Sequence, residues 1–252
     1  MRIKSYLLRM MKLGVFFGFL LGGGSSFSQE TTVLKVGTSS DYPPFSFMDN
    51  GKHAGFDIDL IEEIAKRLHY SVKIIDMPFK TLLPAMQLGT IDLIAAGLSE
   101  TPERAKQVLF LPAHLEGSPF VILTKGQLIT HGIADLKGKE VVVNDGYTAA
   151  QYMQAFPEVH LQYLKSTPDA LAALESNRVF AFVTSKNALS HFFKKHPKVK
   201  DFQSFVIEGT GESTSLAVAK ANTKLFQAIN SVILEMKKDG SLQKLQQKWD
   251  LM

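Results

Sequence analysis

Two patterns of apolar residues alternate along the first part of the chain. Short apolar runs occur at residues 33–38, 72–75 and 91–96, and each has the length of a buried strand. Between them, at about 57–68 and 82–88, apolar residues recur every three or four positions. This spacing places the apolar side chains on one face of a helix, and Asp57 can cap the first of the two helices. The order strand, helix, strand, helix, strand predicts a parallel sheet covered by helices.

The same alternation restarts after Glu116–Pro119, so the sequence predicts two α/β units in series. Further strands are expected at 120–124, 140–143, 161–164 and 179–183, with helices at about 148–156, 167–176 and 185–195. Extended segments are expected at 202–207 and 214–219, followed by helices at 222–238 and 241–249. Open α/β sheets bind their ligands beyond the carboxyl ends of the strands, so the loops at those ends are the candidate site.

Residues 91–104 (I-D-L-I-A-A-G-L-S-E-T-P-E-R) combine a strand end with donors for an anion. Thr101 is expected to cap a helix whose first residue is Pro102. Arg104 falls in the first turn of that helix, on the same side as Ser99. A guanidinium, a hydroxyl and free backbone N–H groups form a seat for a small carboxylate. Taken alone, the segment fits a solvated surface arginine equally well.

Other strand-end loops add aromatic and hydroxyl side chains. Tyr42 and Phe79 follow the first two strands, and residues 146–148 and 184–185 follow strands of the second unit. A single aromatic residue is more typical of core packing than of a ligand site. Their placement on successive strand-end loops favours a cleft that holds a small zwitterion, with donors for its carboxylate and an apolar slot for its side chain.

The first 28 residues are typical of a secretory signal peptide. Four basic residues precede the apolar run 13–21, and small polar residues lead to a plausible cleavage point ahead of Gln29. The run is shorter than the ~20 residues of a membrane span. We therefore expect a cleaved, exported chain located in the periplasm, with an uncleaved anchor as the alternative.

Composition narrows the possible functions. The segment 1–28 holds 4 of the 28 Lys and Arg residues and none of the 24 Asp and Glu residues, so the remainder carries 24 of each charge. A net charge near zero gives no reason to expect nucleic acid or an anionic lipid surface as partner. The sequence has no Cys, which excludes disulfides, thiol catalysis, Cys-based metal sites and a lipoprotein anchor. We expect neither a cofactor nor a metal.

Several motifs resemble the amino-acid-binding family of periplasmic solute-binding proteins, the receptors of ABC importers (bacterial extracellular solute-binding proteins, family 3). The first half of the chain carries four of them, in the family's order: D-Y-P-P-F-S-F at 41–47, G-F-D-I-D-L at 55–60, L-P-A-M-Q-L-G-T-I-D at 83–92 and G-L-S-E-T-P-E-R at 97–104. The second half matches more loosely, through L-K-G-K-E-V-V-V at 136–143, G-Y-T at 146–148 and the ending at 237–249. The combination is specific for the family but not for the ligand.

The resemblance implies a two-lobed, type II periplasmic-binding-protein fold of class α/β. Lobe 1 would comprise 29–115 and 215–252, lobe 2 residues 120–210, and the hinge about 115–120 and 210–215. It further implies a monomer that captures an amino acid, closes over it by a hinge motion and delivers it to ABC permease membrane subunits served by a cytoplasmic ATPase.

The resemblance also assigns roles to individual residues. Arg104 would clamp the ligand α-carboxylate, and Thr148 of lobe 2 would meet the same group. Gly97 and Ser99 would bind the α-ammonium and carboxylate, and Tyr42 and Phe79 would sandwich the ligand side chain.

Two positions depart from the family pattern. Ser185 stands where an Asp usually pairs with the α-ammonium, and Ser39 stands where receptors for cationic amino acids often have an Asp. An ammonium without a carboxylate in a closed cleft loses a strong interaction. Either another acid replaces it, with Asp145, Glu208 and Glu212 as candidates, or the ligand is a carboxylate without a normal α-ammonium. We favour a replacement acid and a neutral polar side chain.

Two other functions compete with that of a transport receptor. One is a periplasmic enzyme on the same scaffold, such as a dehydratase, which would need an acid or base aimed into the cleft. The histidines form no metal-binding or catalytic motif, so the prediction is that the chain is not an enzyme. The other is the sensor domain of a receptor or channel, which the lack of a later membrane segment disfavours.

Overall fold

The structure is a computed structural model that describes residues 32–126, 129–195 and 201–251. The predicted signal peptide and its cleavage point lie outside these residues. Residues 31–252 form one compact unit, and every contact given below lies within it. Within the described ranges, no helix is both long and apolar enough to cross a membrane.

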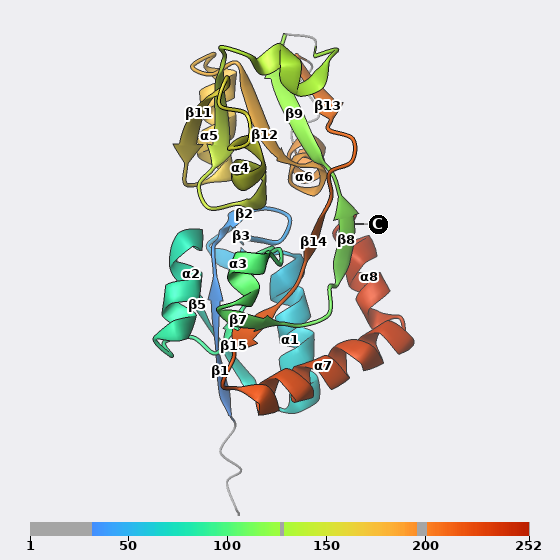
Figure 1. The fold of residues 1–252 in the computed structure, drawn as a ribbon. Coiled ribbons are helices and arrows are strands. Elements are labelled where there is room, and N and C mark those ends of the chain that lie inside the picture. Colours follow the sequence, from blue (N-terminus) through green and yellow to red (C-terminus); the bar gives the residue numbers. More distant parts are fainter. Residues whose placement is uncertain (1–31, 127–128, 196–200, 252) are drawn as a thin grey trace, which may run out of the picture. The chain divides into compact units, whose positions relative to one another are not determined.

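The first lobe is built on a five-stranded sheet of mixed direction (Figure 1). Its order is β5 (Ser71–Asp76), β1 (Val33–Thr38), β6 (Leu93–Ile94), β15 (Ala217–Ala219) and β7 (Val108–Phe110). The first three strands are parallel, as the sequence predicts. The sheet as a whole is mixed, because β15 returns from the far end of the chain and pairs antiparallel with β6 and β7.

Helices cover this sheet because each of them has an apolar face. In α1 (Phe56–Leu68) the residues Ile58, Ile61 and Ile64 are buried, while the acidic and basic side chains from Glu62 to Arg67 are exposed or half-buried. The other helical segments of this lobe are η1 (Phe79–Thr81), α2 (Leu82–Gln87), α3 (Pro102–Ala105), α7 (Thr223–Lys238) and α8 (Ser241–Lys248). A single core cluster includes residues of α1, α7 and the sheet.

The second lobe contains a five-stranded sheet with a core cluster on each face. Its order is β11 (His160–Leu164), β10 (Glu140–Asn144), β12 (Ala181–Ser185), β9 (Phe120–Lys125) and β13 (Phe202–Val206). Its helices are η2 (Gly132–Leu136), α4 (Thr148–Met153), α5 (Thr167–Glu175) and α6 (Lys186–Lys195). Val141 and Val143 face one cluster and Val142 the other, as alternation along a strand requires.

Two antiparallel strands, β8 (Leu115–Ser118) and β14 (Glu212–Thr214), connect the lobes (Figure 1). They fall in the segments predicted as the hinge, and the lobe bounds given above stay a prediction. The segment that follows β1 forms a small three-stranded antiparallel sheet. Its strands are β2 (Asp41–Tyr42), β3 (Ser46–Asp49) and β4 (Lys52–Ala54).

The ends of two helices test the local predictions. Thr101 caps α3 as expected, since its hydroxyl accepts the backbone N–H of Arg104 at 3.3 Å. The expectation that Asp57 caps α1 is wrong: Gly55 is the residue at the cap, and no side chain bonds there. The Asp57 carboxylate instead accepts the backbone N–H of Gly97 at 2.6 Å, because the strand-end loop after β6 passes the start of α1.

Candidate functional site

Arg104 is buried where the two lobes meet. Its Nη1 donates to the carbonyl oxygen of Ser99 at 2.6 Å, and its Nη2 donates to the carbonyl oxygen of Gly146 in the second lobe at 2.8 Å. The guanidinium also lies 5.4 Å from the centre of the Phe79 ring, a cation–π contact. Burial lowers the pKa of Arg104, and the nearby Glu212 carboxylate opposes that shift. The residue stays cationic, because an arginine is not deprotonated in a protein.

Glu212 is the acid that the polar residues of the site surround. Its Oε2 accepts hydrogen bonds from the hydroxyls of Thr148 and, at 3.3 Å, of Ser99. Its Oε1 accepts from the Tyr42 hydroxyl at 3.4 Å. Burial raises the pKa of Glu212, and the hydrogen bonds of Thr148 and Ser99, together with the charge of Arg104, lower it in part. A buried carboxylate beside a cation and several hydroxyls is suited to hold an ammonium group.

The aromatic residues of the site include one that the sequence did not point to. Tyr147, at the start of α4, stacks on Phe79 with ring centres 4.2 Å apart, and its ring edge packs on Tyr42 at 4.7 Å. All three side chains are buried. Tyr147 therefore occupies the slot that Tyr42 and Phe79 are predicted to form for the ligand. The available signal was a large aromatic residue in the short Gly146–Thr148 loop at a strand end.

The remaining predicted residues divide into those near this cluster and those away from it. The Ser185 hydroxyl lies 2.9 Å from that of Tyr42, so it belongs to the cluster. Ser39 donates to the carboxylate of its neighbour Asp41 at 2.8 Å. Of the three candidate acids, only Glu212 lies with Arg104 and Ser99. Asp145 forms an ion pair with Lys80 at 2.7 Å, and Glu208 is exposed.

A group of buried polar residues contacts the backbone of Gly97. Gly97 has a φ of +59°, and the Asp57 carboxylate that accepts its N–H also faces His114 Nε2 at 3.4 Å. The same ring nitrogen lies 3.3 Å from the hydroxyl of Thr214 on β14. This buried chain joins the loop after β6 to both segments that lead between the lobes.

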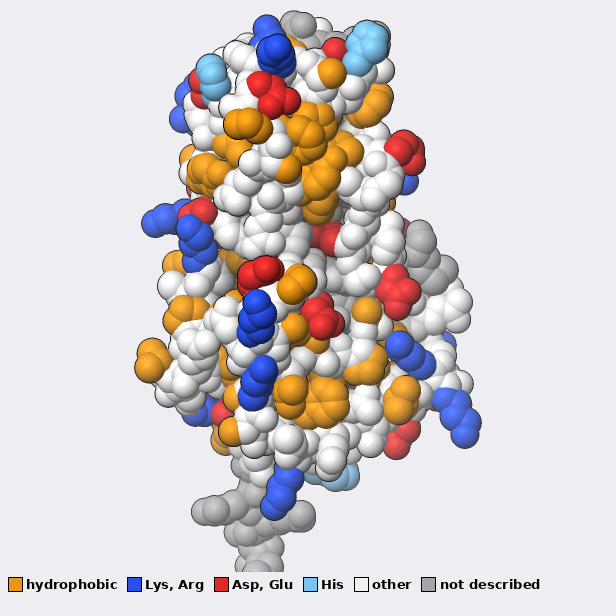
Figure 2. Space-filling model, viewed as in Figure 1, with side chains coloured by type: hydrophobic (Ala, Val, Ile, Leu, Met, Phe, Trp, Pro, Cys, Tyr) orange, Lys and Arg blue, Asp and Glu red, His pale blue; other side chains and the backbone are white. Residues whose placement is uncertain are grey.

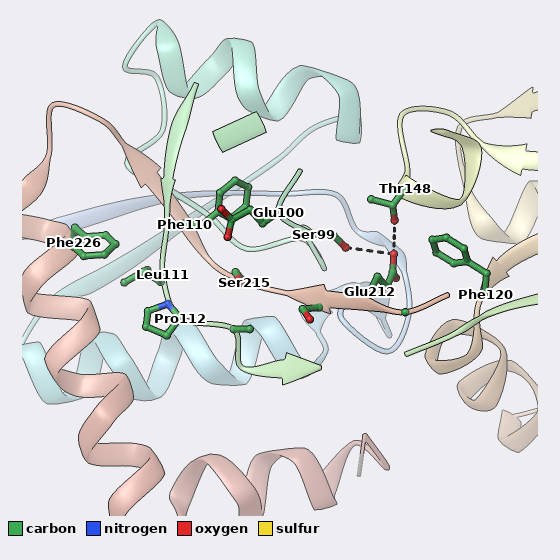
Figure 3. A pocket seen from close by; sticks show the side chains of 13 residues that line it. Ser99, Glu100, Phe110, Leu111, Pro112, Phe120, Thr148, Glu212, Ser215 and Phe226 are labelled. Carbon is green, nitrogen blue, oxygen red and sulfur yellow. Dashed lines mark hydrogen bonds between the residues drawn. The ribbon is translucent and has the colours of Figure 1, made fainter. Parts of the chain in front are cut away.

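A cavity of about 670 Å³ opens beside the polar cluster (Figure 3). Among the described residues its lining comprises Ser99, Glu100, Phe110, Leu111, Pro112, Ala113, Phe120, Thr148, Gly211, Glu212, Ser213, Ser215 and Phe226. Figure 3 shows the side chains of Ser99 and Thr148 directed at Glu212, with Phe226 at the other end of the cavity. Figure 2 shows acidic side chains in the band between the lobes on this face, and hydrophobic ones above and below it.

Comparisons with known proteins agree on one family. The sequence profile of the bacterial extracellular solute-binding proteins, family 3, matches residues 34–251. The chain is 32% identical over 225 residues to ABC transporter arginine-binding protein 1 of Escherichia coli, covering 86% of this chain and 90% of that one.

Solved structures agree with the fold as well. An ancestral arginine-binding protein bound to arginine is 37% identical with a TM-score of 0.81, covering 86% of this chain and 97% of that one. The ancestral amino acid-binding protein AncCDT-1, a precursor of cyclohexadienyl dehydratase, is 32% identical with a TM-score of 0.78, covering 86% and 95%. The expected two-lobed type II fold is confirmed by these neighbours, and this chain belongs to the bacterial extracellular solute-binding proteins, family 3.

Proposed function

We propose that this protein is the substrate-binding protein of an ABC transporter and captures an amino acid in the cleft between its lobes. Relatives described as ABC transporter arginine-binding proteins support the class of ligand and the type of partner. The family is extracellular by description, which supports export. We place the chain in the periplasm as a monomer without a lipid anchor, and its partners are the permease membrane subunits with their ATPase.

One observation carries this proposal: a buried cation and a buried carboxylate meet at Ser99, whose carbonyl oxygen accepts from Arg104 and whose hydroxyl donates to Glu212. Arg104 provides donors for an α-carboxylate, and Glu212 provides the charge for an α-ammonium in place of the Asp that is absent at Ser185. The hydroxyls of Ser99 and Thr148 come from different lobes and meet at the Glu212 carboxylate. The site is therefore complete only when the lobes are together.

Completion of the site by both lobes gives a physical basis for signalling to the permease. A ligand that contacts residues of both lobes binds the closed form more tightly than the open form. The difference between the two binding free energies shifts the equilibrium towards the closed form. In the closed form the surfaces of both lobes can contact the permease at the same time. The permease therefore binds the ligand-bound form in preference to the open one.

Binding without catalysis is part of the proposal. AncCDT-1 is described as the precursor of a dehydratase, so the scaffold itself is compatible with an enzyme. In this chain three hydroxyls donate hydrogen bonds to the buried acid, and a carboxylate held in its ionised form by such donors suits binding an ammonium. Glu212 also disfavours a ligand without an amine, since its buried carboxylate would repel the carboxylate of such a ligand.

The test is thermal unfolding of residues 29–252 with each of the twenty amino acids and with the matching deaminated acids. A ligand at ~100 times its dissociation constant stabilises the folded state by about 2.7 kcal/mol, which raises the unfolding midpoint measurably. We expect shifts with amino acids alone. Shifts confined to the deaminated acids would refute the role of Glu212, and no shift with either set would refute the receptor.

A further inference from the structure

A second set of contacts joins the lobes outside the candidate site. The ring of His191, on α6 of lobe 2, lies 5.1 Å from that of Phe47 on β3 and 6.4 Å from that of Trp249, measured between ring centres. Phe47 and Trp249 both belong to lobe 1, and their rings contact each other edge to face with centres 5.8 Å apart. All three side chains are half-buried. We call Phe47, His191 and Trp249 the interlobe aromatic cluster.

The interlobe aromatic cluster is separate from the candidate site. In the described part of the chain, none of its residues lines the cavity beside Glu212 or the small space next to Tyr42, Tyr147 and Ser185. In Figure 1 the end of the chain, marked C, lies at the level where the two lobes meet. A substitution in the cluster therefore leaves the described walls of the candidate site in place.

The lobe 1 half of the cluster is held in place by lobe 1 itself. Trp249 directly follows α8, and its Nε1 donates to Oδ2 of Asp59 on α1 at 2.6 Å. The Nζ atom of Lys248 donates to the same oxygen at 2.7 Å. A hydrogen bond to a carboxylate is charge-assisted and therefore holds the indole ring firmly. Closure of the lobes brings His191 against a surface that is already ordered, so the contact forms with little loss of side-chain entropy.

An ion pair lies beside the rings but contributes less than they do. Lys194 on α6 pairs with Asp250, the residue after Trp249. Both charged side chains are exposed, and exposed pairs contribute little because water and salt screen them. A contact between aromatic rings multiplies an equilibrium constant by about 2 to 13. The rings are therefore the part of this contact that shifts the balance between open and closed forms.

We propose that the interlobe aromatic cluster stabilises the closed form and thereby sets part of the ligand affinity from outside the ligand site. The inference rests on the proposed function, because it concerns the lobe closure that captures the ligand. A receptor whose closed form is only partly populated binds with an affinity reduced by that fraction. Contacts that raise the closed fraction therefore tighten the binding of every ligand of the site, without selecting among them.

The experiment removes one ring on each side of the contact and pairs each change with a control. His191→Ala removes the lobe 2 ring. Its control is Ser190→Ala, at an exposed residue whose hydroxyl donates to the carbonyl oxygen of Lys186 within the same helix. Trp249→Ala removes a lobe 1 ring. Its control is Trp249→Phe, which keeps an aromatic ring and loses the bond to Asp59. The double variant His191→Ala/Trp249→Ala completes the set.

Two measurements follow the balance between the forms. Calorimetry at pH 8 gives the affinity for each of the twenty amino acids that raises the unfolding midpoint of the wild type. At this pH His191 is neutral, since burial lowers its pKa. Small-angle X-ray scattering of the unliganded proteins gives the radius of gyration, which is larger for the open form. Unfolding midpoints without ligand check that each variant is folded.

We expect His191→Ala to weaken binding about threefold or more if the unliganded wild type is mainly open, by a similar factor for each amino acid that binds. If the unliganded wild type is mainly closed, the same variant increases its radius of gyration instead. Trp249→Ala should change the same quantity in the same direction, while Ser190→Ala and Trp249→Phe should resemble the wild type. The double variant should resemble His191→Ala, because each contact of the cluster that crosses between the lobes involves His191.

Four results would overturn the inference while leaving the proposed function standing. The first is a His191→Ala variant that matches the wild type in both affinity and radius of gyration. The second is a control that changes as much as the variant it is paired with. The third is a double variant whose loss is the product of the two single losses, and the fourth is a His191→Ala loss that differs severalfold between amino acids. If the folded wild type binds none of the twenty amino acids, the proposed function fails and this inference fails with it.

Discussion

Nη2 of Arg104 lies 2.8 Å from the carbonyl oxygen of Gly146, so the proposed carboxylate clamp of lobe 1 is bonded to the backbone of lobe 2. A ligand carboxylate that enters the site replaces a neutral acceptor by a charged one. Charge-assisted hydrogen bonds are roughly twice as strong as neutral ones, so the exchange is favourable. The same guanidinium can thus hold the lobes together before binding and the ligand afterwards.

Replacing Arg104 should remove most of the affinity for an amino acid. Arg104→Ala leaves the ligand carboxylate without a charged partner in a buried site, and losses of this kind cost about 2–5 kcal/mol. Calorimetry with the best amino acid of the panel measures the change directly. We expect a reduction of roughly a hundredfold or more.

Arg104→Lys is the matched control for this prediction. It keeps the positive charge but loses the planar fork that bonds to the carbonyls of Ser99 and Gly146. Affinity should fall between that of the wild type and that of Arg104→Ala. Equal binding by wild type and Arg104→Ala would remove Arg104 from the site.

Ligand affinity should increase with pH above 4.5 because of Glu212. Burial raises the pKa of this carboxyl above its ordinary value of 4.5, so in the folded protein without ligand it stays protonated to a higher pH than in the unfolded chain. That contribution to stability is complete below pH 4.5 and is lost as the pH rises through the raised pKa. A ligand ammonium needs the ionised form, so binding releases a proton and strengthens over the same pH window.

Glu212→Gln separates this effect from general changes with pH. The amide keeps the size of the side chain and removes the titration, so affinity should be lower near neutral pH and its slope above pH 4.5 should disappear. Calorimetry in buffers of different ionisation enthalpy also counts the released protons. A slope that survives in Glu212→Gln assigns the titration to another group.

Most of the fold was predictable because local patterns decide it. The apolar runs give β1, β5, β9 and β10, and the periodic segments give α1, α2, α7 and α8 within a few residues. The antiparallel place of β15 was not predictable, since a pairing between residues 93–94 and 217–218 leaves no trace in either segment. The role of Asp57 was misread for the same reason, because its partner Gly97 lies far along the chain.

The candidate site was predictable in its residue types and not in its contacts. Arg104, Ser99 and Thr148 do come together, and Glu212 is the one candidate acid among them. The sequence could not separate Glu212 from Asp145 and Glu208, because burial decides between them and depends on how the lobes meet. Tyr147 was missed because a loop aromatic gives no indication of which neighbour it stacks on.

Adding one methyl group at Gly97 should disturb both stability and binding. A Cβ atom there would lie 2.9 Å from the Tyr42 ring, and the residue has a φ of +59°. We expect Gly97→Ala to lower the free energy of unfolding by about 1–3 kcal/mol through strain, and by more if Tyr42 cannot move. Urea unfolding and ligand affinity measure the two effects.

Gly89→Ala is the control for backbone strain alone. Gly89 has a φ of +69°, and a Cβ atom there would have no neighbour within 4 Å. This variant should show the strain without loss of affinity. Equal changes in unfolding free energy and ligand affinity at both glycines would mean that the Tyr42 ring moves away from the added methyl group at no cost.

The buried Asp57 should be required for the shape of the loop that carries Ser99. One carboxylate oxygen accepts the Gly97 N–H at 2.6 Å, and the other lies 3.4 Å from Nε2 of the buried His114. Asp57→Ala leaves a buried N–H without an acceptor, which costs about 1–3 kcal/mol, and it removes the partner of His114 as well. Asp57→Asn keeps an oxygen for Gly97, so urea unfolding should show a smaller loss. If binding is lost in Asp57→Ala and restored in Asp57→Asn, the Gly97 contact positions the site. If both variants lose binding equally although both are folded, the charge facing His114 is the part that matters.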